Sequence, residues 1–190
     1  MKVTPVEFLT SQTKYAEINK LPQIAVVGRS NAGKSSLLNM LAGARIAKTS
    51  STPGRTRLIN HFKFGDSFVL IDLPGYGYAA GPKKEKVDWG SMIEGYFAAS
   101  ELLKHVLVLM DIRHEPSAQD IQMLQFLYAR HIPFTVIATK ADKLSKAKRA
   151  AAVHIICKAT SLGRDNVIVS SATENIGREE IYLTIKGVLG

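Results

Sequence analysis

Short hydrophobic runs, separated by segments whose apolar residues recur at helical spacing, follow one another along most of the chain. The runs at 21–28, 105–111 and 134–138 are almost uniformly apolar and rich in β-branched residues, which predicts strands buried on both faces. A shorter run at 166–170 predicts a fourth strand of this kind. The spacing predicts five amphipathic helices, at about 34–42, through 92–97, from 117 past 128, at about 145–159 and through 181–188.

Two further runs, 58–64 and 67–73, are joined by Gly65-Asp66. This dipeptide is a hairpin turn signal, so the two strands should be antiparallel neighbours. Strands that alternate with helices, plus this one hairpin, predict an α/β three-layer fold with a mostly parallel six-stranded sheet and one antiparallel hairpin strand.

A glycine-rich loop lies between the first predicted strand and the first predicted helix. It reads Gly28-Arg29-Ser30-Asn31-Ala32-Gly33-Lys34-Ser35-Ser36 and matches the phosphate-binding pattern G-x-x-x-x-G-K-[ST]. In that pattern backbone N–H groups close on phosphate, the lysine reaches the outer phosphates and the following hydroxyl meets Mg²⁺. The strand before the loop and the helix after it favour a nucleotide site over an incidental glycine-rich turn.

Polar residues follow the other predicted strands at the same edge of the sheet. They form Asp72-Leu73-Pro74-Gly75, Thr139-Lys140-Ala141-Asp142 and Ser171-Ala172. Ligands of open α/β sheets bind beyond the carboxyl ends of the strands, where these segments should meet. Asp72 is placed to hold the hydration shell of Mg²⁺, or else to cap the next turn. The segments 44–57 and 76–86 are rich in turn formers and small residues, which predicts two mobile loops.

Composition narrows the class of protein. With 190 residues, 46% of them hydrophobic, the chain should form one domain over 21–190, preceded by an amphipathic lead-in, 1–20, that packs on the domain edge. We find no apolar run of about 18 residues for a membrane span and no secretory signal, so we expect a cytoplasmic protein, and a monomer. The net charge of +9, concentrated in 43–63 and 140–164, favours RNA or a ribosomal surface as partner, although ordinary solvated lysines would give the same excess.

Taken in order, the motifs resemble the five guanine-nucleotide motifs of Ras-like P-loop GTPases. More narrowly, three strings resemble the EngB (YihA/YsxC) family, a branch of the Era-like bacterial GTPases: the glycine-rich loop, Thr-Pro-Gly-Arg-Thr at 52–56 and Asp-Leu-Pro-Gly-Tyr-Gly-Tyr at 72–78. The resemblance covers nearly the whole chain. It implies GTP and GDP as ligands, with further nucleotide contacts from Gly54, Arg55, Thr56, Arg57, Leu58, Val169, Ser170, Ser171 and Ala172.

Guanine recognition follows from Asp142, whose carboxylate can accept hydrogen bonds from the ring N–H and the exocyclic amine of guanine. Adenine lacks this pair of donors. The resemblance implies that Lys140 lies along the base and braces the phosphate loop, and that the backbone of Ser171 and Ala172 meets the guanine carbonyl. Thr139 stands where asparagine is usual in GTPases, and its shorter side chain makes fewer hydrogen bonds.

The resemblance also implies a Mg²⁺ site formed by Ser35 directly, by Asp72 through water, and by Thr56 when the γ-phosphate is present. Thr49 and Thr52 compete with Thr56 on chemistry alone, and the match to the string at 52–56 selects Thr56. The N–H of Gly75 would sense the γ-phosphate, so that hydrolysis releases both mobile loops.

Catalysis should be slow, because Tyr76 occupies the place where Ras-like enzymes carry a water-positioning glutamine. Asn31 resembles the asparagine with which several Era-related GTPases coordinate K⁺, and alternatively it stabilises the loop. The predicted catalytic residues are therefore Lys34, Thr56, Gly75 and Asn31. Tyr76, Tyr78 and Trp89 could equally contact a partner or pack over the loop.

A Mg²⁺-dependent GTP switch with slow hydrolysis is the function that this resemblance implies, acting in assembly of the large ribosomal subunit and needed for normal cell division and septation. A guanine-nucleotide-dependent scaffold at the division septum, with negligible catalysis, is the alternative. A third hypothesis is an ATP-dependent phosphotransferase, which would not depend on Asp142 for its choice of nucleotide.

Overall fold

The computed structural model describes residues 4–47, 58–76 and 89–190. Its centre is a seven-stranded sheet in the order β1-β3-β4-β2-β5-β6-β7. Strand β3 is antiparallel to both of its neighbours, and the other pairs are parallel. The strands are β1 (Val6–Gln12), β2 (Gln23–Gly28), β3 (Ile59–Phe64), β4 (Phe68–Asp72), β5 (Leu103–Asp111), β6 (Phe134–Thr139) and β7 (Val167–Val169).

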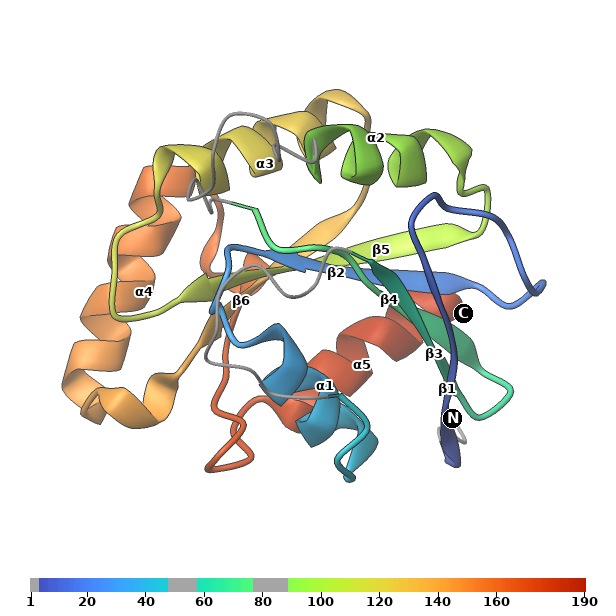
Figure 1. Cartoon of the computed structure of the whole chain (residues 1–190). Coiled ribbons are helices and arrows are strands. Elements are labelled where there is room, and N and C mark those ends of the chain that lie inside the picture. Colours follow the sequence, from blue (N-terminus) through green and yellow to red (C-terminus); the bar gives the residue numbers. More distant parts are fainter. Residues whose placement is uncertain (1–3, 48–57, 77–88) are drawn as a thin grey trace, which may run out of the picture.

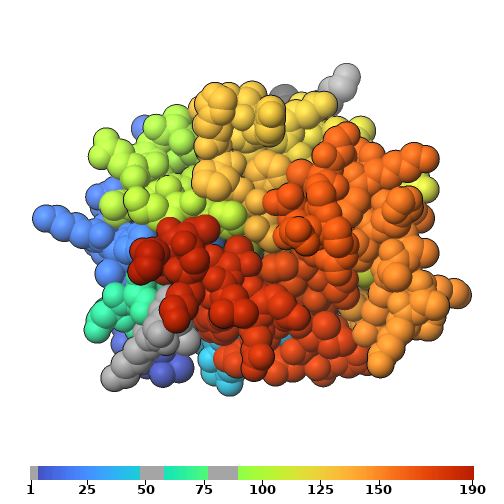
Figure 2. Space-filling view, turned by 180° about the vertical axis from the view of Figure 1, so that it is seen from behind, coloured from blue at the N-terminus to red at the C-terminus, as the bar shows by residue number. Residues whose placement is uncertain are grey.

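Helices cover both faces of the sheet (Figure 1). The α-helices are α1 (Lys34–Ala42), α2 (Trp89–Ala99), α3 (Ala118–Ala129), α4 (Lys146–Thr160) and α5 (Arg178–Leu189), and two 3₁₀ turns, η1 (Ala141–Lys143) and η2 (Arg164–Asn166), flank α4. Helices α1 and α5 pack on one face, and α2, α3 and α4 pack on the other. Seen from the other side, both the C-terminal residues in red and the orange residues further back in the chain reach the surface (Figure 2).

Alternating strand residues supply the two cores. In β2, Ala25 and Val27 belong to the cluster under α2, α3 and α4, whereas Ile24 and Val26 belong to the cluster under α1 and α5. All four side chains are fully buried. Burial on both faces explains why the central strands carry no polar alternation and why their sequences are continuous apolar runs.

The predicted fold class is confirmed, with one difference in the sheet. Residues 6–12 form an edge strand, β1, paired with β3, where we expected an amphipathic lead-in, so the sheet has seven strands and not six. A shift in register between Phe8 and Thr10 interrupts the two-residue alternation of β1. The sequence therefore lacks the alternating pattern that would have predicted a strand here. None of the residues of β1 is fully buried, and even the apolar Phe8 is 55% exposed.

The ends of two helices are fixed by specific side chains. Ser117 and Asp120 form a reciprocal capping box at the start of α3, the helix predicted to begin at residue 117. At the end of α1, Arg178 donates from Nε to the Met40 carbonyl (2.8 Å) and from Nη2 to the Leu41 carbonyl (3.2 Å). None of the helices in the described ranges is long and apolar enough to cross a membrane.

Candidate nucleotide site

The glycine-rich loop connects the end of β2 to the first residue of α1, as predicted. Two of its residues, Asn31 (φ 65°) and Gly33 (φ 94°), have left-handed backbone conformations. A Cβ on Gly28 would lie 2.9 Å from the carbonyl oxygen of Leu109 in β5, so this glycine allows a close approach between neighbouring strands. The loop therefore turns tightly at the sheet edge and leads into a helix N-terminus, where phosphate is favoured.

Lys34 and Asp72 influence each other's ionisation beside this loop. Burial lowers the pKa of Lys34, and the negative charge of Asp72 offsets part of that effect. Burial likewise raises the pKa of Asp72, and the charge of Lys34 and a hydrogen bond from Asn60 (3.2 Å) work against it. The Lys34 ammonium donates to the carbonyl of Gly28 (3.2 Å). The site thus brings a lysine and a buried aspartate together at the root of the loop, where each influences the ionisation of the other.

One oxygen of Asp72 has no hydrogen-bond partner among the described residues. Oδ1 is buried and unpaired, while Oδ2 accepts from Asn60 of β3. A buried carboxylate oxygen without a donor is costly unless something occupies its remaining coordination positions. Water molecules around a divalent cation would satisfy this requirement, and the hydroxyl of Ser35 in the same region is the kind of oxygen that such a cation binds. The residues present therefore fit a Mg²⁺ ion.

The backbone of residues 75–76 lies against the glycine-rich loop. The Ser30 N–H donates to the Tyr76 carbonyl (2.9 Å), and the Tyr76 N–H donates to the Gly28 carbonyl (3.3 Å). A Cβ on Gly75 would lie 2.9 Å from Nζ of Lys34 and 3.1 Å from the backbone nitrogen of Ser30, so a side chain here would crowd both the lysine and the loop. Gly75 is consequently next to the group that is expected to reach the outer phosphates.

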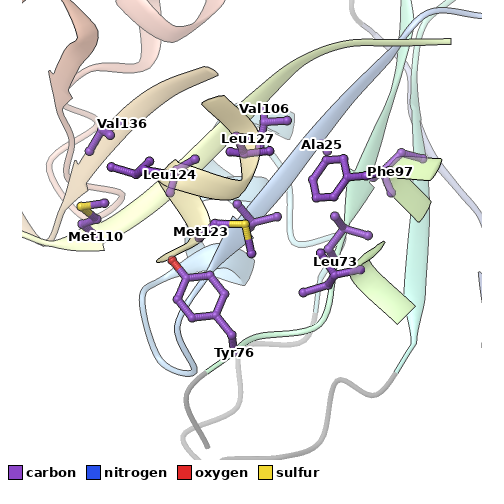
Figure 3. Packing of buried hydrophobic residues seen from close by; sticks show 14 of the residues in the cluster. Ala25, Leu73, Tyr76, Phe97, Val106, Met110, Met123, Leu124, Leu127 and Val136 are labelled. Carbon is purple, nitrogen blue, oxygen red and sulfur yellow. The ribbon is translucent and has the colours of Figure 1, made fainter. Parts of the chain in front are cut away.

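The Tyr76 side chain is fully buried and points away from this loop. Its hydroxyl donates to Oδ1 of Asp120 (2.9 Å) at the start of α3, and Figure 3 shows the ring beside Met123 and Leu124. Burial, followed by the charge of Asp120, raises the pKa of Tyr76. Tyr76 therefore packs in the core against α3, whereas we expected it to contact a partner or to pack over the loop. Residues 77–88, including Tyr78, lie outside the described part of the chain.

Thr139 joins the second part of the site to the glycine-rich loop. Its hydroxyl donates to the Ala32 carbonyl (2.8 Å) and lies 3.1 Å from the Met110 carbonyl. The ammonium of Lys140 lies 2.9 Å from Oδ2 of Asp111, which ends β5. The structure thus assigns the bracing of the loop to Thr139, whereas we expected it from Lys140. Threonine, although its side chain is shorter than the asparagine usual here, makes this connection through its hydroxyl.

Asp142 and Ser171 meet, although 29 residues separate them in the chain. The Ser171 hydroxyl donates to Oδ1 of Asp142 (2.8 Å), and the Lys143 ammonium lies 3.0 Å from Oδ2. Burial by itself raises the pKa of Asp142, but the hydrogen bond from Ser171 and the neighbouring Lys143 outweigh it, so the pKa lies below its usual value. Asp142 is therefore a carboxylate, and hence a hydrogen-bond acceptor, at neutral pH.

A cavity of about 140 Å³ connects the two halves of the site. Its lining combines the glycine-rich loop and the start of α1 with the two segments expected to recognise the base, 139–143 and 170–174, which we call the base-recognition segments. The lining residues are Gly33, Ser36, Leu37, Thr139, Lys140, Asp142, Lys143, Ser170, Ala172 and Thr173. The predicted residues of 28–36, 72–75, 139–142 and 169–172 are thus gathered at one edge of the sheet. Leu58 is described but is absent from this lining, and Gly54, Arg55, Thr56 and Arg57 lie outside the described residues, as do Thr49 and Thr52.

Two residues of this region were not singled out in the sequence. Asp111 ends a central strand and pairs with Lys140 and Arg113; these partners and Asp111's position at a strand end give a weak signal that sequence reasoning could have used. The pKa of Asp111 would be raised by burial, but hydrogen bonds from Arg113 and Lys140 hold it well below its usual value. Arg149, on α4, donates to the carbonyls of residues 141 and 144, a role that no motif in the sequence indicates.

Comparison with known proteins defines the class of this fold and site. A family model described as "50S ribosome-binding GTPase" matches residues 23–140. A solved structure of Aquifex aeolicus Era, bound to GDP and AlF4⁻, is 27% identical and covers 90% of this chain and 58% of that chain, with a TM-score of 0.72. Another, of a probable GTP-binding protein engB, is 24% identical with a TM-score of 0.73 and covers 88% of this chain and 98% of that one, and its likeness concerns the fold. The protein is a P-loop GTPase that binds GTP and GDP and hydrolyses GTP.

Curated relatives narrow the class further. "Probable GTP-binding protein EngB" of Geobacter metallireducens is 44% identical over 192 residues, covering 100% of this chain and 94% of the relative. The protein of the same name from Desulforamulus reducens is 47% identical over 187 residues, covering 95% of this chain and 91% of the relative. The chain belongs to the EngB family of GTP-binding proteins.

Proposed function

We propose that this protein is a Mg²⁺-dependent GTP switch with slow hydrolysis that acts, as a monomer in the cytoplasm, in assembly of the large ribosomal subunit. The observation that carries the nucleotide part is the cavity shared by the glycine-rich loop and Asp142. One ligand can reach both only if it has a phosphate group at one end and a hydrogen-bond-donating base at the other. GTP and GDP have this form.

The roles of the residues follow from their places in the site. The N–H groups of 28–36 and the N-terminus of α1 would bind the phosphates, with the Lys34 ammonium neutralising them. Asp142 would accept from the guanine ring N–H and amine, and the backbone of Ser171 and Ala172 would donate to the guanine carbonyl. Mg²⁺ would be held by Ser35, by Asp72 through water and by Thr56, and when bound it supplies positive charge at the phosphates.

Slow hydrolysis follows from the place of Tyr76. The Tyr76 hydroxyl donates a hydrogen bond to Asp120 and the ring is buried, so this side chain cannot position water as a glutamine would. We propose that Lys34, Asn31 and the N–H of Gly75 supply stabilisation of the developing charge, together with Thr56 from the segment outside the described residues. We therefore expect turnover in the range of unassisted GTPases, about 10⁻⁴ to 10⁻² per second.

The nucleotide assignment is tested by displacement of fluorescent GDP by GTP, ATP and XTP. GTP should displace fluorescent GDP from the parent protein, and ATP at the same concentration should not. In Asp142→Asn, an amide donor faces the guanine amine, and preference should move to XTP, whose base offers a carbonyl there. Unchanged preference in Asp142→Asn would overturn this assignment, and efficient displacement by ATP would favour the phosphotransferase.

Asn31 supports a second proposal, that K⁺ contributes to hydrolysis. Its side chain is exposed at the loop, next to where phosphate would bind. Its left-handed backbone also suits a purely structural role, since asparagine tolerates this conformation better than most residues. GTP turnover compared in K⁺ and in Na⁺ at equal ionic strength separates the two: a higher rate in K⁺ that is lost in Asn31→Ser supports coordination, and identical rates in the two salts exclude it.

The ribosomal role rests on the description of the matching family model and on charge. That model is named for 50S ribosome binding, and a second solved Era structure, also 27% identical to this chain, is a complex with MgGDPNP and nucleotides 1506–1542 of 16S ribosomal RNA. The net charge of +9 is compatible with such a partner. Co-sedimentation with large ribosomal subunits in GTP, but not without nucleotide, is the expected result. Exclusive association with division proteins would instead support the septal scaffold.

A further inference from the structure

The two segments that would recognise guanine are linked by an arginine outside all of the motifs. Arg149 lies in the first turn of α4, where its side chain is 19% exposed. It is absent from the lining of the cavity beside Asp142 and lines instead a separate cavity of about 630 Å³, shared with other residues of α4. Arg149 therefore contacts the base-recognition segments from outside the cavity that Asp142 lines.

The guanidinium holds the chain on both sides of Asp142. Its Nε donates to the carbonyl of Ala141 (2.8 Å) and to the carbonyl of Leu144 (2.9 Å). The Ala141 carbonyl belongs to the peptide group whose nitrogen is that of Asp142. One N–H group thus ties together the two ends of η1, the turn from which the Asp142 carboxylate projects.

The same side chain reaches the second recognition segment. Nη2 of Arg149 donates to Oε2 of Glu174 (3.2 Å). The N–H of Glu174 donates to the Ser171 hydroxyl (3.2 Å), which in turn donates to Oδ1 of Asp142 (2.8 Å). These contacts close a ring that runs from Arg149 through Glu174 and Ser171 to Asp142 and back through the backbone. A change at any member of the ring would therefore change the position of the others.

We propose that Arg149 is a positioning residue for guanine recognition, which fixes the Asp142 carboxylate and the Ser171 segment in one relative geometry. This rests on the proposed guanine site, and Arg149 itself touches no nucleotide. The planar fork of arginine suits the task because its donors point in fixed directions to several acceptors at once. Lysine carries its three donors on one nitrogen and lacks the planar fork by which Nε and Nη2 of Arg149 reach the backbone carbonyls and Glu174 from separate points.

The test measures affinities for GDP and for inosine diphosphate, which differ only in the exocyclic amine of the base. Their ratio reports the hydrogen bond from that amine to Asp142 and does not depend on how much of a variant is folded. We expect Arg149→Ala to bind GDP about tenfold more weakly and to lose most of the GDP preference, while affinity for inosine diphosphate falls much less. Arg149→Lys should lose the GDP preference as Arg149→Ala does. The lysine variant provides the test if the alanine variant does not fold.

Arg178→Ala is the matched control. Arg178 also donates to two backbone carbonyls, but these belong to Met40 and Leu41 at the end of α1. Its loss should lower stability and leave the ratio unchanged. If Arg149→Ala and Arg149→Lys both keep the parent ratio, Arg149 is only a structural residue and the inference is wrong.

Failure of the inference is distinguishable from failure of the proposed site. Asp142→Asn changes the group that would contact the base itself, so it should abolish the GDP preference whatever Arg149 does. An Asp142→Asn protein with the parent ratio overturns the guanine site and the inference together. An Asp142→Asn protein with a changed ratio, beside Arg149 variants without one, overturns the inference alone.

Discussion

At the scale of single residues, Thr139 shows how one hydroxyl can connect two parts of a site. It has a single hydrogen to donate, and the shorter distance shows that the main acceptor is the Ala32 carbonyl, inside the glycine-rich loop. A side chain of the same shape without the hydroxyl would leave that buried carbonyl unsatisfied. The loop would then be held to β6 by packing alone.

We predict that Thr139→Val lowers stability by about 1–2 kcal/mol, the usual cost of losing a buried hydrogen bond, and weakens GDP binding several-fold. Urea unfolding and GDP titration measure the two effects. Thr160→Val is the control, because it removes a hydroxyl that donates to the Ile156 carbonyl (2.7 Å) in α4, away from the loop. GDP affinity in Thr139→Val equal to that of the control would contradict the role of Thr139.

Two buried histidines make the stability of the protein depend on pH. His61 is fully buried and His105 nearly so, and burial lowers the pKa of each to about 4. In the unfolded chain the pKa is about 6.5, so both side chains take up protons more readily when the protein unfolds. Their stabilising effect is complete above pH 6.5 and is lost as the pH falls towards 4.

We predict that each histidine accounts for about 2 kcal/mol of the stability lost between pH 7 and pH 4.5. In His105→Gln, which can keep a hydrogen bond to Thr135, this loss should be smaller by about that amount. Urea unfolding at the two pH values measures the difference. The parent and variant would lose the same stability if His105 were already charged in the folded protein.

At the scale of elements, glycines in different surroundings should respond oppositely to the same added methyl group. Around Gly28 the backbone of β5 leaves no room, whereas a Cβ on Gly95, in α2, meets nothing within 4 Å. Gly28 therefore allows the end of β2, where the loop begins, to lie close to β5. Gly95 only adds freedom to a helix that alanine would stiffen.

We predict that Gly28→Ala destabilises the protein by about 1–3 kcal/mol, because backbone must move, and that Gly95→Ala stabilises it by about 0.5–1 kcal/mol. Thermal unfolding without nucleotide compares the two directly, since each variant adds one methyl group. Opposite signs are the expected outcome, and a loss of similar size in both would mean that local space is not the deciding factor.

The sequence was sufficient for six of the seven strands, all five α-helices and most of the residues around the cavity, because these carry strong local signals. Uniform apolar runs such as 105–111 and the glycine-rich loop need no knowledge of their neighbours. Strand β1 and Arg149 could not be predicted in the same way. The first depends on pairing with β3, the second on carbonyls brought near by the fold, and neither partner is visible in a local pattern.

At the scale of the whole molecule, charge and site lie close together. The basic stretch 140–164 contains η1 and α4, so its lysines adjoin the segment that carries Asp142. Lys148 and Lys158 are exposed on α4. A polyanionic partner attracted to this helix would therefore lie beside the predicted base-recognition segment.

We predict that the double variant Lys148→Glu/Lys158→Glu co-sediments with large ribosomal subunits at least tenfold more weakly than the parent, because four units of charge change on one surface. Lys14→Glu/Lys20→Glu alters the net charge equally in an exposed segment after β1 and should have a much smaller effect. Equal losses in both double variants would show that only overall charge matters.

The place of β1 has a consequence for synthesis of the chain. Among the described strands its one neighbour is β3, which begins at Ile59, so more than forty residues must be translated after Gln12 before the two can pair. Until then the emerging segment has its backbone donors and acceptors open to water or to other chains. Strand β1, although it is made before the other strands of the sheet, must thus wait for β3, and a nascent chain halted before β3 would expose it for as long as the pause lasts.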